Sequence, residues 1–139
     1  MLNVIQEMKE VCPSIKVAFL ASVNRAQGVD ECRDTVDLAI KAKQLENGQN
    51  LVGLELSGDP RVGDFEAFKS QFQTARDNGL KISLHCAEIR EQQQESDSMI
   101  EFNPDRLGHC CYLDSAQINK VHHLGIPVEI CPSSNVATV

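Results

Sequence analysis

The segment KISLHCAEIR, residues 81–90, places two residues that can do chemistry three positions apart. His85 follows a short, largely apolar run typical of a buried strand, and Glu88 comes just after it. A neutral imidazole suits zinc, and a carboxylate in a closed site can carry a proton during catalysis. Each residue also has an ordinary explanation, His85 as a hydrogen-bonded core histidine and Glu88 as a solvated glutamate at the start of a helix. On this segment alone both interpretations stay open.

Further candidates lie where other strands are expected to end. His109, in DRLGHCC, could polarise or deprotonate a metal-bound water, or be a satisfied core histidine. In SGDP, Gly58 lets the backbone approach a planar ligand closely and Asp59 adds a carboxylate. Gly-Asp-Pro is equally common in plain turns. Asn24 and the segment CPSSN (131–135) offer amides and hydroxyls, again with a turn as the alternative.

The chain has six cysteines and no C-x-x-C pair. Without a secretory signal we expect reduced thiols that act as small buried hydrophobic residues. Cys86, Cys110 and Cys131 lie close to expected strand ends, so a Cys/His metal cluster is the alternative.

Strand-like and helix-like segments alternate along the chain. We expect strands at residues 16–21, 51–58, 81–85, within 106–113 and at 127–131. We expect helices at residues 2–10, 30–48, 64–79, 90–103 and 114–125. The alternation predicts right-handed βαβ units and a parallel sheet in a single domain over residues 1–139. The near-continuous apolar strands predict a sheet buried on both faces.

The carboxyl ends of parallel strands lie at one face of an α/β sheet or a β/α barrel, where such folds place their active sites. Polar residues follow each of the five expected strands, so we expect them to lie together. From the residues alone we predict an α/β enzyme, and a metal-dependent hydrolase is the class that these residue types suit.

Composition excludes several classes of protein. Of 139 residues, 42% are hydrophobic and 24% charged, as in ordinary globular proteins. The formal net charge of −7 argues against a nucleic-acid surface. No apolar run approaches the roughly 18 residues that a membrane helix needs. The first residues do not resemble a secretory signal, so we expect a cytosolic protein that binds neither membrane nor nucleic acid.

Four segments in chain order resemble the adenosine deaminase family, above all its N6-methyl-AMP deaminase branch: LVGLELSGDP, LKISLHCAE, DRLGHC and VEICPSSN. The resemblance covers essentially the whole chain and only the middle of the family's length. It implies a partial (β/α)8 TIM-type barrel with about five parallel strands, one catalytic zinc ion, and hydrolysis of the C6 amine of a purine.

The resemblance also implies roles for individual residues. His85 matches a zinc ligand, Glu88 the residue that protonates purine N1, and His109 the histidine beside the zinc-bound water. Gly58, followed by Asp59, matches a backbone donor facing purine N3. Asn24 stands where the branch commonly has a substrate-binding aspartate. These types suit the reaction, because attack at C6 drives electrons to N1, where a protonated Glu88 relieves the charge.

Some positions depart from the family pattern. No H-x-H motif occurs, and the family's pair of aspartates would lie beyond Val139, so His85 is the only ligand of the family's set. Cys110 replaces a usual glycine and could crowd its turn. We therefore expect a partial chain, inactive alone, from a monomeric enzyme that converts N6-methyl-AMP or AMP to IMP. The alternatives are an adenosine deaminase proper and a non-catalytic binding or regulatory fragment. Arg25 and Arg61 are the candidate cations for a 5′-phosphate.

Overall fold

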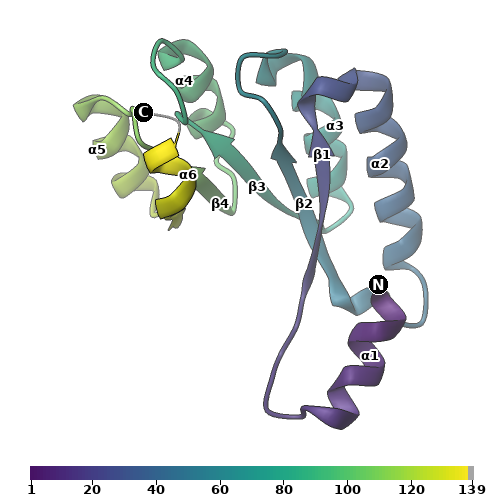
Figure 1. Ribbon diagram of the computed structural model, residues 1–139. Helices are drawn as coiled ribbons and strands as arrows, with labels where there is room; N and C mark the ends of the chain where they lie inside the picture. The colour runs from purple at the N-terminus through teal and green to yellow at the C-terminus, as the bar shows by residue number, and fades with distance from the viewer. Residues whose placement is uncertain (138–139) are drawn as a thin grey trace.

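A computed structural model of the chain describes residues 1–137 and shows strands and helices in alternation (Figure 1). The strands are β1 (Phe19–Asn24), β2 (Leu51–Ser57), β3 (Lys81–Cys86), β4 (Arg106–His109) and β5 (Val128–Glu129). The helices are α1 (Leu2–Val11), η1 (Arg25–Gln27), α2 (Gly28–Lys43), η2 (Gly48–Asn50), α3 (Phe65–Asp77), α4 (Gln93–Glu101), α5 (Ser115–Leu124) and α6 (Pro132–Ala137). No helix in residues 1–137 is both long and apolar enough to cross a membrane.

The five strands form one parallel sheet in the order β1-β2-β3-β4-β5. Each strand is joined to its neighbour through a helix, which is the βαβ unit expected from the sequence. Within the described residues β1 pairs only with β2 and β5 only with β4, so the sheet is open. The predicted parallel α/β architecture is confirmed. That residues 1–139 form a single domain stays a prediction.

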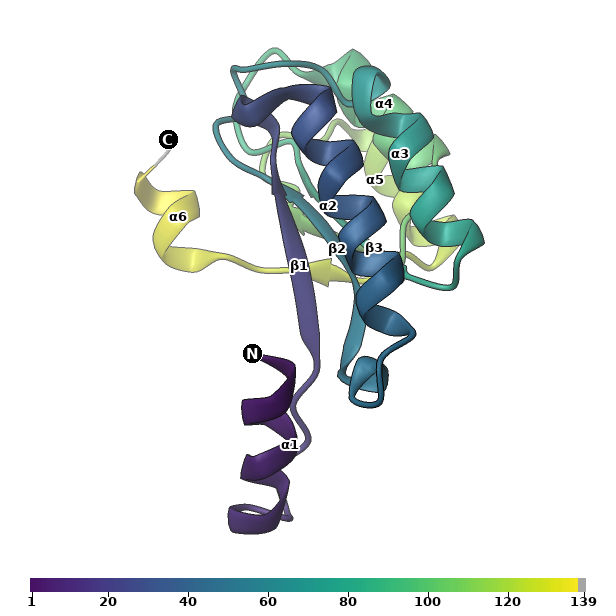
Figure 2. The ribbon, with the colours of Figure 1, turned by 90° about the vertical axis from the view of Figure 1, so that its right-hand side faces the viewer.

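One face of the sheet carries the hydrophobic core. Figure 2 shows α2 to α5 on this side and α6 on the other. Side chains of α3 fill the space between helices and strands, with Phe65, Phe68 and Phe72 all essentially inaccessible. Leu54 and Leu84 meet them from the sheet. Because strand side chains alternate in direction, every second residue of β2 and β3 joins this core.

The opposite face of the sheet is polar, which the sequence interpretation missed. Glu55, Ser57, Ser83 and His85 lie at the alternate positions of β2 and β3, and Glu55, Ser57 and His85 are half-buried. Ser83 is buried but hydrogen-bonds the Arg106 guanidinium. The prediction of two apolar faces is therefore wrong. A run such as LVGLELSG reads as apolar because Leu and Gly flank one glutamate.

Several element ends were predicted correctly because capping residues mark them. Asp64 caps α3 by accepting a hydrogen bond from the Glu66 N–H. Asp114 and Gln117 form a capping box at the start of α5. Gly125 ends that helix in the left-handed conformation, with φ of 66°.

Other boundaries differ from the prediction. β1 starts at Phe19, where its ladder with Leu51 begins, and not at residue 16. α2 ends at Lys43, because the chain turns back at Gly48 and packs against the last carbonyls of the helix. β5 has two residues, since α6 starts at Pro132 within a segment that had been interpreted as a turn. Proline at a first helical position is favourable, because its missing N–H would have no helical partner there.

Candidate functional site

His85, Glu88 and His109 come together at the carboxyl ends of β3 and β4. One potential ligand atom from each residue lies within 4.8 Å of the others. His85 Nδ1 is 3.3 Å from His109 Nε2, and His109 Nε2 is 3.7 Å from Glu88 Oε2. The two imidazole rings meet edge to face, with centroids 4.8 Å apart. The structure therefore brings these three predicted site residues into one group.

The other nitrogen of each imidazole faces an oxygen. His85 Nε2 lies 2.7 Å from Glu55 Oε1, and His109 Nδ1 lies 2.9 Å from Asn135 Oδ1. A carboxylate and an amide oxygen accept protons, so they favour the tautomers that carry hydrogen on these outward nitrogens. The lone pairs of His85 Nδ1 and His109 Nε2 then converge with the Glu88 carboxylate. Two facing lone pairs at this distance repel each other unless a cation or a proton lies between them.

Glu55 is a functional-site residue that the sequence interpretation missed. Its hydrogen bond with His85 is the main reason that the pKa of its carboxyl lies below the ordinary value, against the effect of burial. It could have been found from its register, because Glu55 aligns with Ser83 across the sheet and so shares the face of His85. Asn135 had been noted only as one polar residue of a strand end, and α6 brings it over the site.

The backbone explains why His109 faces the site. Strand alternation places Leu107 in the core, so His109 would follow it there. His109 and Cys110 instead have φ values of 64° and 56°, in the left-handed region. This departure from the extended conformation turns the His109 ring toward His85 and Asn135. Glu88 follows Ala87, which also has a positive φ, and accepts a hydrogen bond from Ser134 at 3.3 Å.

Asn24, Gly58 and Asp59 form a second group at the same edge of the sheet. Asn24 pairs in register with Ser57, and Gly58 follows with a φ of 101°. A side chain at Gly58 would collide with Asn24 Oδ1, so only glycine fits beside this amide. Asp59 is partly exposed, and hydrogen bonds from the Arg61 side chain and backbone lower its pKa to about 2. The substrate contacts expected of these three residues stay predictions.

The two arginines considered for a phosphate have different environments. Arg25 is 4% exposed and pairs with the buried Glu95. Its Nε and Nη2 also donate to the carbonyls of Val62 and Gly63, at 2.7 and 2.9 Å. Arg61 has 76% of its side chain exposed and holds Asp59. The guanidinium of Arg25 thus makes its hydrogen bonds and its ion pair inside the protein, and Arg61 is the more accessible of the two cations.

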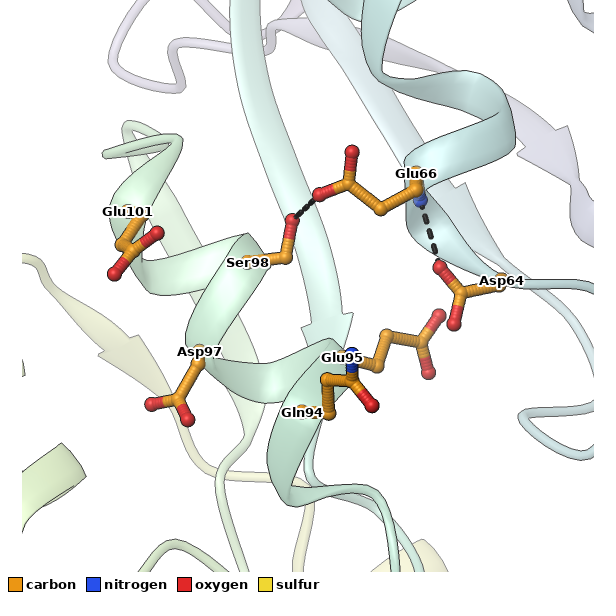
Figure 3. A pocket seen from close by; sticks show the side chains of 7 residues that line it. All are labelled: Asp64, Glu66, Gln94, Glu95, Asp97, Ser98 and Glu101. Carbon is orange, nitrogen blue, oxygen red and sulfur yellow. Dashed lines mark hydrogen bonds between the residues drawn. The ribbon is translucent and has the colours of Figure 1, made fainter.

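A separate hollow of about 390 Å³ lies on the helical side of the sheet, between α3 and α4. Figure 3 shows its acidic lining, with Asp64 and Glu66 on one side and Asp97 and Glu101 on the other. Glu95 extends from α4 toward the start of α3, where it accepts a hydrogen bond from the Phe65 N–H at 2.8 Å. This hollow contains none of the strand-end candidates.

The cysteines take no part in the His/Glu group among residues 1–137. Cys86 is buried behind His85, and Cys131 contacts the backbone of Glu129. The Cys/His metal cluster that the sequence left open therefore gains no support from the geometry.

The strand-end position of the His/Glu group in a parallel sheet is typical of barrel-type α/β proteins that can bind a metal. The family model described as adenosine deaminase matches residues 3–139, and the chain belongs to that family. Three relatives carry a narrower name. The N6-mAMP deaminase of Arabidopsis thaliana is 37% identical over 124 residues, covering 89% of this chain and 34% of that protein. The N6-methyl-AMP deaminases of Danio rerio and Homo sapiens are 36% and 35% identical over 141 residues, covering 97% of this chain and 40% and 39% of theirs.

Solved structures confirm the fold prediction. Arabidopsis ADAL complexed with GMP superposes with a TM-score of 0.82 at 37% identity, covering 89% of this chain and 35% of that one. Arabidopsis ADAL complexed with IMP gives a TM-score of 0.81 at the same identity and coverage. The described sheet is thus an open, five-stranded part of a TIM-barrel-type fold. The chain spans between about a third and two fifths of the length of these relatives.

Proposed function

We propose that this chain carries part of the site of a zinc-dependent deaminase that hydrolyses the C6 amine of a purine nucleotide, with N6-methyl-AMP as the substrate. The observation that carries the proposal is the convergence of His85 Nδ1, His109 Nε2 and the Glu88 carboxylate. Of the three, His85 offers zinc a nitrogen ligand, and His109 and Glu88 lie beside it, where an attacking water and the purine would react. The names of the relatives supply the substrate class.

In this proposal each residue acts on a stated atom. His85 would hold zinc and is oriented by Glu55, as ligating histidines are by carboxylates. Zinc held there would supply the chemistry of lowering the pKa of a water near it. His109 orients the attacking water, and Glu88 gives a proton to purine N1 as charge develops there. The backbone of Gly58 faces purine N3, and the side chains of Asn24 and Asp59 contact the nucleotide.

The chain by itself holds too few ligands for turnover. A catalytic zinc site usually has three protein ligands, and the sequence contains no H-x-H motif to supply the missing histidines. We expect the 139-residue chain to form inosinate from N6-methyl-AMP at least about 100-fold more slowly than a full-length relative, because ligand and orientation are both incomplete. Activity closer than that would show that the chain completes its site in another way.

Zinc binding provides the sharper test. The purified chain is titrated with zinc by calorimetry, alongside the variants His85→Ala and His122→Ala. His122 lies exposed on α5 and serves as the matched control. We expect H85A to weaken zinc binding by about tenfold or more and H122A to leave it unchanged. Equal affinity in all three proteins would contradict the assignment of His85.

A substrate panel separates the proposed activity from its alternatives. The full-length protein that contains this segment is assayed with N6-methyl-AMP, AMP and adenosine. Preference for adenosine would favour an adenosine deaminase proper, and zinc-independent nucleotide binding without turnover would favour a binding role. Glu88→Gln should lower kcat by about 100-fold or more with little change in KM, because its proton acts on the transition state.

A further inference from the structure

Two cysteines stand directly behind the histidines of the site. Cys86 follows His85 at the end of β3, and Cys110 follows His109 at the end of β4. The two strands are adjacent and parallel, with Cys86 in register with His109. The Cys110 N–H donates a hydrogen bond to the Cys86 carbonyl at 2.9 Å. Cys110 lies one residue beyond that register partner, so its backbone stays next to Cys86 across the two paired strands.

The side chains of the two cysteines lie on the same side of the sheet. Cys86 is 1% exposed and belongs to the core under the helices. The left-handed conformation of His109 and Cys110 turns the imidazole to the polar face and leaves the Cys110 thiol packed against that same core. The thiols of Cys86 and Cys110 are hydrogen-bonded to each other, and close approach of the two sulfur atoms is what a disulfide requires. Both cysteines are reduced, and Cys110 is partly exposed.

We propose that Cys86 and Cys110 are a reversible oxidation site, at which a peroxide converts the two thiols into a disulfide. The Cys110 sulfur attacks one peroxide oxygen, the O–O bond breaks, and a sulfenic acid and one water form. The Cys86 sulfur then attacks the Cys110 sulfur and displaces the hydroxyl group as a second water. The two thiols lose two electrons and two protons, and the peroxide is reduced to two waters.

The bond would tie together the residues that follow His85 and His109. Because both imidazoles are positioned by their own backbone, a link between positions 86 and 110 constrains the distance between the rings. Exposed Cys111 and partly exposed Cys131 lie nearby and provide internal controls. The effect on nucleotide binding rests on the proposed function, but formation of the disulfide does not.

Mass spectrometry of the intact chain tests the proposal. After treatment with hydrogen peroxide we expect the loss of two hydrogens and a peptide crosslink between positions 86 and 110, reversed by dithiothreitol. Cys111→Ser and Cys131→Ser should form the same crosslink. Cys110→Gly and Cys86→Ala should not, and circular dichroism verifies that both are folded. A crosslink through Cys111 or Cys131, or only the addition of oxygen, would overturn the assignment.

A second measurement separates this proposal from the proposed function. IMP is titrated by calorimetry into the reduced and the oxidised chain. If the reduced chain binds IMP, we expect binding to weaken by about tenfold on oxidation and to recover on reduction. If the reduced chain does not bind IMP, the result counts against the proposed function and the crosslink still decides the thiol pair. Equal affinity in a fully crosslinked sample would overturn the link between the pair and the site.

Discussion

At the scale of single residues, the turn formed by His109 and Cys110 combines strain with function. Non-glycine residues in the left-handed region cost about 1–2 kcal/mol each. The strain is retained here because the turn aims His109 at His85. Cys110 has a φ of 56°, which glycine adopts without strain; the crowding of this turn by the Cys110 side chain stays a prediction.

Replacing Cys110 with glycine should therefore stabilise the chain. We expect Cys110→Gly to raise the free energy of unfolding by about 0.5–1 kcal/mol, since relief of strain outweighs the added flexibility of glycine. Urea denaturation followed by circular dichroism measures the change. Cys111→Gly is the control, because Cys111 does not have a positive φ, and it should destabilise. An equal decrease in the free energy of unfolding in both variants would show that the backbone of Cys110 is not strained.

The sequence predicted part of the site at this scale. His85, Glu88 and His109 were identified because each follows an apolar strand, and parallel strands end at one edge. Glu55 was missed because its role depends on register with β3, which is a property of strand pairing. Arg25 was considered for a phosphate because position alone does not reveal that its guanidinium is buried and paired.

At the scale of elements, the loop of residues 58–64 is held by side chains from distant parts of the chain. Arg25 holds the carbonyls of Val62 and Gly63, and Gln92 donates to the carbonyl of Pro60 at 2.5 Å. Glu95 completes the arrangement by pairing with Arg25. The loop that carries Gly58 is thus shaped by side chains from η1 and from the start of α4.

Breaking the buried pair should destabilise this arrangement. We expect Glu95→Gln to lower the free energy of unfolding by about 3 kcal/mol, because Arg25 would remain buried without a counter-charge. Hydrogen exchange of residues 60–65 should accelerate at the same time. Glu101, on the same helix as Glu95, forms an exposed pair with Lys120 of α5, and Glu101→Gln should have little effect. Similar losses for both variants would contradict a special role of the buried pair.

Asp105 joins the starts of β3 and β4 and makes the stability depend on pH. Burial tends to raise its pKa, but hydrogen bonds from Lys81 and from the Ile82 N–H outweigh burial and hold the pKa below its ordinary value. A carboxyl with a lowered folded-state pKa stabilises the protein above its unfolded pKa of about 3.9 and loses that contribution as the pH falls further.

Asp105→Asn should remove this contribution selectively. We expect the free energy of unfolding to fall by about 1 kcal/mol at neutral pH, and this difference should shrink toward zero as the pH falls below the unfolded pKa of about 3.9. Thermal unfolding of both proteins across this pH range measures the difference. The exposed Asp37→Asn on α2 is the control and should follow the unmodified chain. A constant difference at all pH values would show that the ionised carboxylate is not responsible.

Element boundaries were predictable where local chemistry sets them. The starts of α3 and α5 follow from Asp64 and Asp114, whose side chains cap the helix. The start of β1 could not be predicted from local residues, because residues 16–18 look equally strand-like. It is set by pairing, since the first ladder partner of β1 is Leu51. Helix α6 was missed because Ser and Asn favour turns when judged by type alone.

At the scale of the whole molecule, the hydrophobic core that stabilises the fold lies between the sheet and helices α2 to α5. Helix α1 extends below the sheet in Figures 1 and 2, with its first residue, Leu2, packed against this core. It buries Ile5 and forms an apolar hollow of about 180 Å³ with Ile15 and Val17. The order of strands and helices was predictable because each element carries its own periodicity. Whether the sheet is open or closed depends on whether its edge strands, β1 and β5, pair with further strands. Local sequence patterns do not encode such pairing.

Deleting residues 1–11 should accordingly leave a cooperative fold. We expect a loss of about 2 kcal/mol, the value of burying one isoleucine. Phe72→Ala, in the centre of the core, should cost more, about 3–5 kcal/mol. Calorimetry compares the two variants. If the deletion were the more damaging change, α1 would have to be part of the folding core.

The pairing of Arg25 with Glu95 also has a kinetic consequence. The two residues are 70 positions apart, so their contact closes a long loop and should form late, after the local βαβ units. Substitutions at this pair should then speed unfolding while leaving the refolding rate nearly unchanged. The loop beside the site would be the last part of the sheet edge to take shape on folding and the first to open.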